Sequence, residues 1–577
     1  MPHHPVPPTR AERQKAFQAA QSLQQAGRWA EAERAWSALA RDLPGHAGVQ
    51  ANLAMVLWRL GRTAEADTAC DRALAADPNM VQALAISAAC AEVRDDPDAA
   101  IERYRRALDI KPDLATAVQG LANLYVRKGD YAQARAQAER LTELAPAAAA
   151  AWAALGAIRL AENTLDAADA ALAEALRLDP NLAAAHANRG AVAAARRDWP
   201  AALAFAETAL GLDDRLVQAH ANRGNALASL GRRADAEAAF DRALALDPAD
   251  ADALYNRALL WLTQGRWADA WPGFEARWRL RDMAPWRREF AAPKWDGAAA
   301  PESTLLIHGE QGIGDAIMMA RYLPMAAARV GRLVVECHPR LRDLLAAMPD
   351  LPETVDFVAA GETPPAFDMY LPIMSLPGVF STTPENVPWD GPYISPLPAR
   401  QTVGVESQQT KESPHTRESQ QTKVGITWAG NPDNPNDRAR SLPLAALAPV
   451  FDVEGCAFFS LQFGPGTEEL ASSGMADRLE DLGPRLGDFA TTAAWVAEMD
   501  VVITVCTAMA HLAGAMGKPT WVLLASDADW RWLEARADSP WYPTARLFRQ
   551  ADAGDWPGVA ARVADALKEY AETGGKE

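Results

Sequence analysis

Three glycines and one acid follow a short apolar run in HGEQGIGDAI, residues 308–317. Gly309, Gly312 and Gly314 leave the backbone free of side chains at three points, and Asp315 begins a helical pattern. The order G-x-x-G-x-G matches neither the dinucleotide fingerprint G-x-G-x-x-G nor a P-loop, which requires Gly-Lys-Ser/Thr. Asp315 is therefore either a helix-start acid favoured by the helix dipole or a carboxylate placed above a strand end to take a proton.

A second candidate site lies in VVITVCTAMAHLAGAMGKP, residues 501–519. A buried strand pattern passes through Cys506 and Thr507 into a helix of small residues that begins at Ala508. Backbone N–H groups at a helix start, together with the Thr507 hydroxyl, can hold a diphosphate. A plain strand-to-helix turn is the alternative, and His511 is either a packed core histidine or a ligand contact.

Two arginines follow another strand pattern, in NPDNPNDRAR, residues 431–440. Arg438 and Arg440 would stand at the upper edge of a sheet, and the planar guanidinium binds phosphate oxygens in pairs. A solvated loop is the alternative interpretation.

Short apolar runs that alternate with helical stretches must position these residues. The runs are 304–307, 333–337, 424–428, 457–461, 501–505 and 520–524. Such alternation predicts βαβ units with parallel sheets, here one lobe over residues 303–400 and a second over 424–577. Between them, ESQQTKESPHTRESQQTK at 406–423 has no large apolar side chain. We expect a disordered insertion at 401–423, because such a segment cannot bury enough surface to offset its ordering entropy.

The first half of the chain has a period of 34 residues. Prolines stand at 44, 78, 112, 146, 180 and 248, and with repeats starting at residue 13 the twentieth position is always alanine. These alanines are Ala32, Ala66, Ala100, Ala134, Ala168, Ala202, Ala236 and Ala270. With glycines at the inter-helix turns, the pattern resembles the tetratricopeptide repeat (TPR) and predicts eight helix pairs over 13–284, followed by a connector at 285–302.

Stacked helix pairs form a superhelix whose concave surface suits extended protein segments. Asparagines recur at the sixth repeat position, at Asn52, Asn188, Asn222 and Asn256, with Asn123 at the ninth position of its repeat. They are either solvated helix positions or a ladder that contacts a bound peptide. The eighth repeat ends in tryptophans instead of proline, which suggests a capping repeat packed against the next domain.

Length and charge limit the remaining possibilities. A chain of 577 residues needs several cores, and a net charge of -18 disfavours association with nucleic acid or anionic lipid. Five scattered cysteines without a C-x-x-C pair indicate neither a disulfide framework nor a zinc site. With no signal-peptide pattern and no membrane-length apolar run, we expect a cytoplasmic protein.

Four stretches together resemble a known enzyme family. GEQGIGDAI, TWAGNPDNPNDRARSLPL, SLQFGPG and TAMAHLAGAMGKP, in this order, look like a GT-B glycosyltransferase similar to the heptosyltransferases, over about residues 303–570. Repeats ahead of such a unit also resemble the domain order of O-linked N-acetylglucosamine transferases. The resemblance implies an α-solenoid (TPR superhelix) followed by an α/β GT-B unit of two Rossmann-like lobes, with the acceptor on the first lobe and the nucleotide-sugar donor on the second.

The same resemblance implies roles for the candidate residues. Asp315 would be the general base of an inverting transfer, on an acceptor loop shaped by Gly312 and Gly314. The donor would contact Cys506, Thr507, Ala508, His511, Arg438 and Arg440. No metal and no cofactor other than the nucleotide-sugar substrate is then required. Asp527 and Asp529 form a D-x-D pattern, which binds metal and nucleotide in another glycosyltransferase fold, but two acids in a loop are common.

Cys506 departs from the pattern of the resembled family, which usually has an acid there in D-T-x-x-x-H. A thiol is a weak hydrogen-bond acceptor, so the donor differs, the activity is low, or the unit is a pseudoenzyme. The leading hypothesis is a glycosyltransferase whose TPR arm recruits a protein acceptor. The alternatives are a non-catalytic TPR scaffold with a degenerate GT-B domain, and a saccharide-modifying heptosyltransferase relative.

Overall fold

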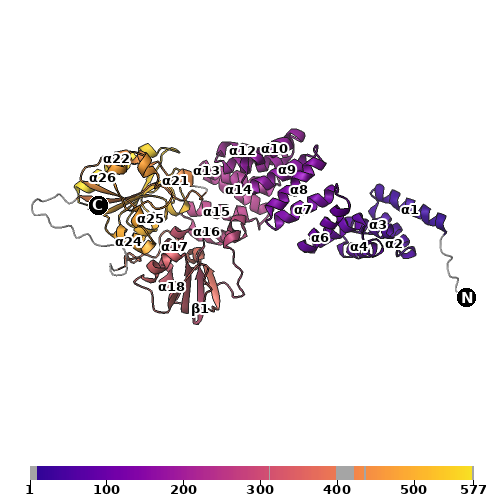
Figure 1. Cartoon of the computed structure of the whole chain (residues 1–577), viewed down its shortest axis with the longest axis horizontal. Helices are drawn as coiled ribbons and strands as arrows, with labels where there is room; N and C mark the ends of the chain where they lie inside the picture. Colours follow the sequence, from indigo (N-terminus) through magenta and orange to yellow (C-terminus); the bar gives the residue numbers. More distant parts are fainter. Residues whose placement is uncertain (1–8, 311, 398–420, 435–436, 575–577) are drawn as a thin grey trace, which may run out of the picture. The chain divides into compact units, whose positions relative to one another are not determined.

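The computed structural model describes residues 9–310, 312–397, 421–434 and 437–574. The chain separates into two compact units, Met1–Leu246 and Asp247–Glu577 (Figure 1). Residues 401–420 of the predicted disordered insertion lie outside the described residues, and a strand already begins at Thr422. None of the described helices is long and apolar enough to cross a membrane.

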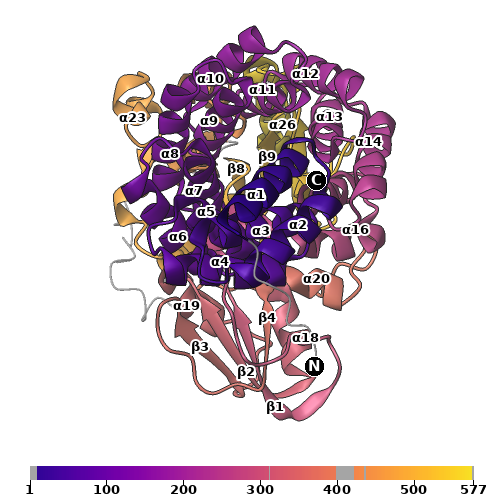
Figure 2. The same cartoon turned by 90° about the vertical axis from the view of Figure 1, so that its right-hand side faces the viewer.

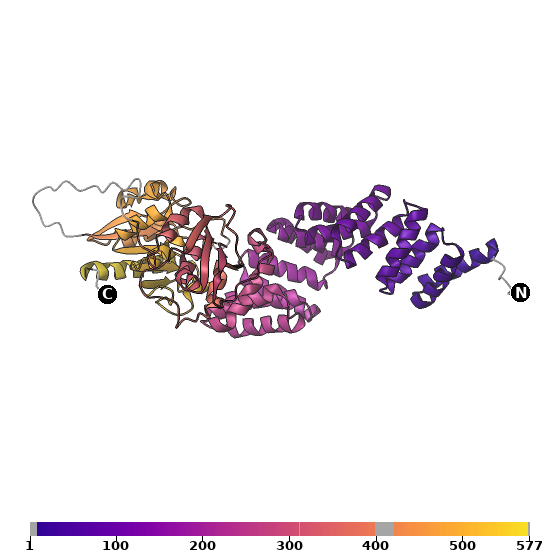
Figure 3. The same cartoon turned by 90° about the horizontal axis from the view of Figure 1, so that it is seen from below.

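The 34-residue period corresponds to pairs of helices. They are α1 (Arg10–Gln25), α2 (Trp29–Asp42), α3 (Ala47–Arg59), α4 (Thr63–Ala76), α5 (Val81–Val93), α6 (Pro97–Ile110), α7 (Ala115–Arg127), α8 (Tyr131–Leu144), α9 (Ala149–Ala161), α10 (Leu165–Leu178), α11 (Ala183–Ala195), α12 (Trp199–Leu212), α13 (Val217–Ser229), α14 (Arg233–Leu246), α15 (Ala251–Thr263) and α16 (Trp267–Phe274). Within the first unit, α7 to α14 follow one another around an arc in Figure 2, and Figure 3 shows the pairs from the side.

Each helix pair turns through one residue in the left-handed backbone region. The residues, with φ between 58° and 81°, are Gly27, Gly61, Asp95, Gly129, Asn163, Arg197, Gly231 and Gly265. Glycine adopts this conformation without steric cost, and Asn and Asp tolerate it better than other residues. Arg197 is neither glycine, asparagine nor aspartate, so the turn of its repeat uses a left-handed conformation that arginine disfavours.

Small residues allow the paired helices to approach closely. The alanines at the twentieth repeat position are all between 0% and 1% exposed. Gly224 on α13 has a similar role, because a Cβ there would lie 2.5 Å from the Phe240 ring on α14. Close packing of this kind explains why the period is so evident in the sequence.

Asparagines at the sixth repeat position hydrogen-bond to the solenoid backbone where their contacts are resolved. The Asn52 amide donates to the carbonyl of Gly48 in its own helix at 2.8 Å. The Asn222 amide donates to the carbonyl of Ala187 in the preceding repeat at 3.0 Å. The ladder that would contact a bound peptide therefore stays a prediction.

The second unit contains two parallel sheets. Sheet A has the order β3-β2-β1-β4 and sheet B the order β10-β9-β8-β5-β6-β7. The strands are β1 (Ala300–His308), β2 (Val330–Cys337), β3 (Val355–Ala359), β4 (Met369–Pro372), β5 (Thr422–Thr427), β6 (Cys456–Ser460), β7 (Glu480–Asp481), β8 (Val501–Val505), β9 (Thr520–Leu524) and β10 (Ala545–Arg549). Figure 2 shows sheet A and Figure 1 the helices around both sheets. This part of the chain is an α/β domain.

Helices connect the strands, as parallel pairing requires. The helices between the strands are α17 (Ile313–Met319), α18 (Leu323–Ala327), α19 (Arg342–Ala346), α20 (Leu376–Val379), α21 (Asp437–Arg440), α22 (Ala448–Phe451), α23 (Glu469–Ser472), α24 (Phe489–Ala497) and α25 (Ala508–Ala515), and α26 (Trp556–Glu572) follows the last strand. In sheet A the chain continues from β1 to β2 and β3 on one side, and β4 then pairs with the other side of β1. In sheet B it continues from β5 to β6 and β7 on one side, and β8 then pairs with the other side of β5. Ligands of open α/β sheets bind at such switch points, outside the carboxyl ends of the strands.

The eighth helix pair, α15 and α16, shares a core with the sheets of the second unit. Trp267 stacks on Trp541 with ring centroids 4.8 Å apart. The indole N–H of Trp271 donates to the carbonyl of Thr382 at 2.7 Å, and Phe274 contacts the ring of Trp530. The expected capping repeat, packed through its tryptophans against the next domain, is confirmed.

A buried ion pair holds the segment after α16 against sheet A. This segment begins with the 3-10 helices η1 (Glu275–Arg279) and η2 (Arg281–Trp286). Arg277 donates to both carboxylate oxygens of Glu310, at 3.0 and 2.8 Å, and both side chains are 0% exposed. Arg277 also contacts Glu275 at 2.7 Å and the hydroxyl of Ser375 at 2.9 Å. The segment is therefore fixed to the loop that follows β1.

Candidate functional site

Three of the predicted donor residues meet at the switch point of sheet B. Cys506 and Thr507 follow β8, and Arg440 at the end of α21 donates to the Cys506 carbonyl at 3.0 Å. Asp437 holds the same guanidinium at 3.1 Å. Gly430 after β5 makes room for it, because a Cβ there would lie 2.6 Å from the Arg440 Nη2 atom.

Arg438 differs from Arg440 in its surroundings. Its side chain is exposed, and no contact within the described part of the chain joins it to Cys506 or Thr507. The two arginines are two residues apart, so one short helical turn points them in different directions. Only Arg440 is thus brought to the switch point in this structure.

Thr507 begins α25 as its N-cap. The hydroxyl accepts the N–H of Met509 at 3.3 Å and lies 3.3 Å from the hydroxyl of Thr504. Ala508, the first residue of the helix, is half-buried. The turn therefore has the polarity of an anion site, while part of its hydrogen-bonding capacity is used by the cap.

The Cys506 side chain is half-buried beside Trp532. The indole N–H of Trp532, on the 3-10 helix η9 (Trp530–Trp532), lies 3.0 Å from its sulfur. Burial raises the pKa of Cys506 to about 11. The thiol is therefore protonated at neutral pH, which disfavours a role as nucleophile.

His511 on α25 is a packed core histidine. It is 4% exposed, its Nδ1 lies 3.0 Å from the hydroxyl of Tyr542, and its ring stacks on Trp532. Burial lowers the pKa of His511 to about 3, so the imidazole is neutral. Of the two interpretations from sequence, these contacts favour the core histidine over the ligand contact.

Asp315 takes part in an ion network with two other side chains. Its Oδ2 accepts the N–H of Gly312 at 3.0 Å, as expected of an acid at a helix start. Its Oδ1 pairs with Arg531 at 2.5 Å, and Arg531 pairs with Asp529 at 2.7 Å. Although burial opposes ionisation, Arg531 lowers the pKa of Asp529. One carboxylate of the D-x-D pattern, that of Asp529, is thus bound by an arginine.

Arg531 was missed by sequence reasoning. It stands two residues after Asp529, between two tryptophans, and no periodic pattern marks it. Only the packing of η9 brings its guanidinium to Asp315, since the two residues are far apart in the chain. The nearest available signal was its closeness in sequence to the D-x-D pattern.

The boundary between the two lobes is filled where α17 meets α25. A Cβ at Gly314 would lie 2.7 Å from the His511 ring and 3.2 Å from Ala508 Cα, so glycine permits this helix contact. Nearby, Arg321 is 4% exposed and donates to the carbonyl of Trp541 at 2.7 Å. Gly314 therefore lies in a packed contact, whereas Gly312 is exposed at the start of α17.

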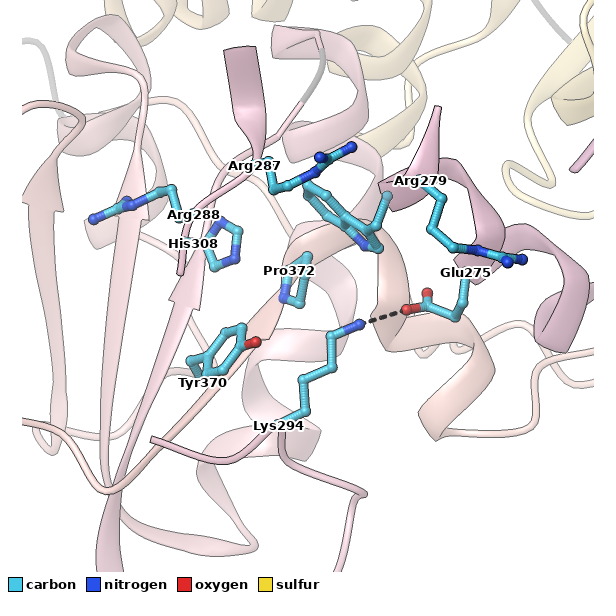
Figure 4. A pocket seen from close by; sticks show the side chains of 9 residues that line it. Glu275, Arg279, Arg287, Arg288, Lys294, His308, Tyr370 and Pro372 are labelled. Atoms are coloured by element: carbon cyan, nitrogen blue, oxygen red, sulfur yellow. Dashed lines mark hydrogen bonds and ion pairs between the residues drawn. The ribbon is translucent and has the colours of Figure 1, made fainter. Parts of the chain in front are cut away.

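A pocket of about 290 Å³ lies at the other switch point, at the carboxyl ends of β1 and β4. Its lining comprises Glu275, Trp278, Arg279, Arg287, Arg288, Lys294, His308, Tyr370 and Pro372 (Figure 4). The sequence prediction divided the basic segment 277–288 between the eighth repeat, which ended at residue 284, and the connector, which began at residue 285. The signal that could have found it was the run RWRLRDMAPWRR itself, which is strongly basic in an acidic chain.

No group of three or more His, Cys, Asp or Glu side chains suited to a metal ion occurs among the residues that the structure describes.

Comparisons with known proteins identify the repeats. Two tetratricopeptide-repeat families match the chain, one at residues 17–81, 52–115 and 222–284 and the other at residues 94–158. Together with the observed helix pairs, these matches show that the N-terminal part of the chain, to about residue 284, consists of TPR repeats.

Similar proteins match only parts of the chain. Protein FlbA of Caulobacter vibrioides is 28% identical over 326 residues, which are 52% of this chain and 52% of FlbA. The chain thus spans about half the length of that curated relative. Among solved structures, a TPR protein from Parabacteroides merdae is 16% identical, with 43% of this chain and 98% of that chain covered and a TM-score of 0.36. Yeast Tom70 is 18% identical, with 44% of this chain and 56% of that chain covered and a TM-score of 0.33.

Proposed function

We propose that the chain is a glycosyltransferase that moves a sugar from a nucleotide-diphosphate donor to an acceptor hydroxyl, and that the TPR arm recruits a protein as acceptor. The observation that carries the proposal is the cluster at the switch point of sheet B. There, Arg440 is fixed beside Cys506 and the Thr507 cap of α25. A guanidinium next to a helix start suits the two phosphates of a leaving nucleotide.

The transfer step balances without a metal ion. Asp315 takes the proton of the acceptor hydroxyl as the oxygen attacks the anomeric carbon, and the bond from that carbon to the phosphate oxygen breaks. The nucleotide diphosphate leaves with the bonding electrons. Its growing charge is stabilised by Arg440 and by the N–H groups at the start of α25, which are fixed before the reaction begins.

Asp315 can accept a proton only if the acceptor hydroxyl reaches one of its oxygens. The Gly312 N–H occupies one acceptor position on Oδ2 and Arg531 occupies one on Oδ1. A carboxylate has about four such positions in all. Arg531 binds one of these oxygens at 2.5 Å. The proposal therefore requires the acceptor to approach Asp315 beside Arg531, or to displace it.

The TPR repeats support the part of the proposal that concerns a protein partner. Stacked repeats of this kind present a concave surface to extended protein segments. The alternative of a saccharide-modifying heptosyltransferase relative would use the same transfer step, with a saccharide instead of a protein as the acceptor.

A second candidate is a protein-binding scaffold whose α/β unit binds a ligand without catalysis. The ion pairs of Arg531 with Asp315 and Asp529 favour it, as does a neutral thiol at position 506 where an acid would bind sugar hydroxyls. Protein binding by the repeats is common to both candidates, so the α/β unit decides between them.

Nucleotide release from a panel of nucleotide-sugars, measured with the full chain and peptide or protein acceptors, tests the proposal. Arg440→Gln should weaken nucleoside-diphosphate binding roughly tenfold or more, because a charge-assisted hydrogen bond is lost. Asp315→Asn should abolish transfer while nucleotide binding stays unchanged.

Asp529→Asn is the matched control, because it also removes one carboxylate from Arg531 but leaves the proposed base. It should retain transfer. Equal loss of transfer in both variants would assign Asp315 a structural role. Nucleotide binding without turnover of any donor would favour the scaffold, and absence of nucleotide binding would contradict both uses of the sheet B site.

A further inference from the structure

The pocket of sheet A is formed by two parts of the chain. His308, Tyr370 and Pro372 come from the carboxyl ends of β1 and β4, and the basic side chains come from the segment after α16. Figure 4 shows the strand residues on one side and Arg279 with Glu275 on the other. At about 290 Å³ the pocket is near the lower end of the ~300–1,000 Å³ typical of small-molecule sites.

Positive charge remains uncompensated at this pocket. Lys294 pairs with Glu275 at 2.7 Å, and Arg288 pairs with Glu336 at 2.6 Å. Arg279 and Arg287 donate only to the carbonyls of Ala249 and Leu280, at 2.7 and 3.4 Å. Across the described ranges neither guanidinium has a carboxylate partner, although the chain as a whole carries a net charge of -18.

The other lining groups are aromatic and uncharged. Trp278 and Tyr370 line the pocket with their rings, and each ring already has a neighbour: Tyr370 stacks on His308, and the Arg277 guanidinium lies 4.9 Å from the Trp278 ring. The indole N–H of Trp278 is buried without an acceptor among the described residues. An unmade hydrogen bond of this kind costs free energy, which a ligand oxygen that reaches the N–H would recover. Burial lowers the pKa of His308 to about 4, so the imidazole adds no charge at neutral pH.

The pocket is also held rigidly. Arg277, next to Trp278 in the chain, is locked between Glu310 and Glu275 by ion pairs of 2.8 and 2.7 Å. The buried Arg277–Glu310 pair fixes the basic segment to the loop that follows His308. A site held in this way loses little freedom when a ligand binds, which favours affinity.

We propose that this pocket binds a small anionic ring compound, in which a carboxylate or phosphate group pairs with Arg279 and Arg287 while the ring packs against Trp278 and Tyr370. Guanidinium groups bind both kinds of acid group in a bidentate manner, and aromatic faces pack against the C–H groups of a ring. The ligand class is therefore a sugar acid or a sugar phosphate. This site is separate from the Arg440 cluster, which lies on sheet B.

Calorimetric titration of the full chain in buffer free of phosphate, at constant ionic strength, tests the proposal. The probes are glucose 6-phosphate, glucuronate, inorganic phosphate and neutral glucose. We expect one or both sugar anions to bind at least roughly tenfold more tightly than glucose or inorganic phosphate. The tighter of the two identifies the acid group.

Arg279→Gln and Arg287→Gln should each weaken that binding roughly tenfold or more, since each loses a charge-assisted hydrogen bond. Arg287 is the safer substitution, because its bond to the Leu280 carbonyl is long at 3.4 Å. Arg281→Gln is the matched control: Arg281 is exposed on the same segment, pairs with Asp282 and does not line the pocket. It should change the affinity by no more than about twofold.

Arg440→Gln locates the binding and separates this proposal from the proposed function. Sugar-anion binding that survives Arg440→Gln and is lost in the Arg279 and Arg287 variants supports the sheet A pocket, whether or not transfer is found. The opposite pattern would overturn the pocket. So would equal affinity for glucose, binding of inorganic phosphate as tight as that of the sugar anions, or no binding of any anionic probe at millimolar concentration.

Discussion

Substitution of Glu310 by Gln removes the negative charge that neutralises the buried guanidinium of Arg277. The glutamate accepts two hydrogen bonds from Arg277 and one from the N–H of Met374, at 3.0, 2.8 and 3.0 Å. Both side chains are 0% exposed, so water cannot replace the lost charge. We expect Glu310→Gln to destabilise the second unit strongly.

The magnitude follows from the cost of an uncompensated buried charge. Breaking one side of a buried ion pair costs about 3–5 kcal/mol, against a typical net stability of ~5–15 kcal/mol. Glu275 still contacts Arg277 at 2.7 Å and is 37% exposed, so we expect a value near 3 kcal/mol. Glu275→Gln is the comparison variant, since it removes the less buried carboxylate from the same arginine and should cost less than Glu310→Gln.

Thermal unfolding followed by tryptophan fluorescence measures the stability of the second compact unit, in which Glu310 lies. Of the 19 tryptophans, 14 lie in residues 247–577, so the signal reports mainly on the second unit. A loss near 3 kcal/mol should lower its midpoint by several degrees, roughly 5–10 °C. Equal midpoints for Glu310→Gln and Glu275→Gln would refute the reasoning, because the two carboxylates differ chiefly in burial.

Two further predictions concern the repeats and the response to acid. Gly61→Ala should destabilise the first unit by about 1 kcal/mol, because φ is 75° there and a Cβ meets nothing within 4 Å, so the cost is backbone strain alone. The control Gly45→Ala, at a position without positive φ, should leave the thermal midpoint measured by circular dichroism unchanged. Equal midpoints for the two variants would contradict this account. Burial lowers the pKa of His511 to about 3 and of His308 to about 4, so the unfolded chain binds more protons below pH 6.5. The second unit should therefore lose up to about 1.4 kcal/mol per histidine for each pH unit between pH 6.5 and the folded pKa of that histidine, about 3 for His511 and about 4 for His308. His511→Phe should reduce the slope of unfolding free energy against pH in this range, and an unchanged slope would exclude His511 as a source.

The strands that the sequence predicted are the interior ones. The runs at 304–307, 333–337, 424–428, 457–461, 501–505 and 520–524 became β1, β2, β5, β6, β8 and β9. Interior strands of a parallel sheet are buried on both faces, so they are continuously apolar. The missed strands β3, β4, β7 and β10 are sheet edges, and they contain residues such as Asp356, Pro372 and Arg546.

The sequence also predicted the site residues at strand ends better than those on segments without a periodic pattern. Cys506, Thr507 and Arg440 could be expected to meet, because the carboxyl ends of parallel strands share one edge of a sheet. Arg531 and Arg287 lie on irregular segments, where no periodicity relates a residue to its neighbours in space. Their positions depend on packing between segments far apart in the chain, which the sequence pattern does not encode locally.

The shared core of the eighth helix pair determines where such a chain can be recombined. Periodicity alone suggests that a foreign repeat arm could be joined after residue 284. A junction there would remove the native Trp267 and Trp271, which pack against Trp541 and Trp530. The first compact unit ends at Leu246, so a chimera that keeps Asp247 onward retains the shared core of the eighth helix pair while the preceding repeats are exchanged.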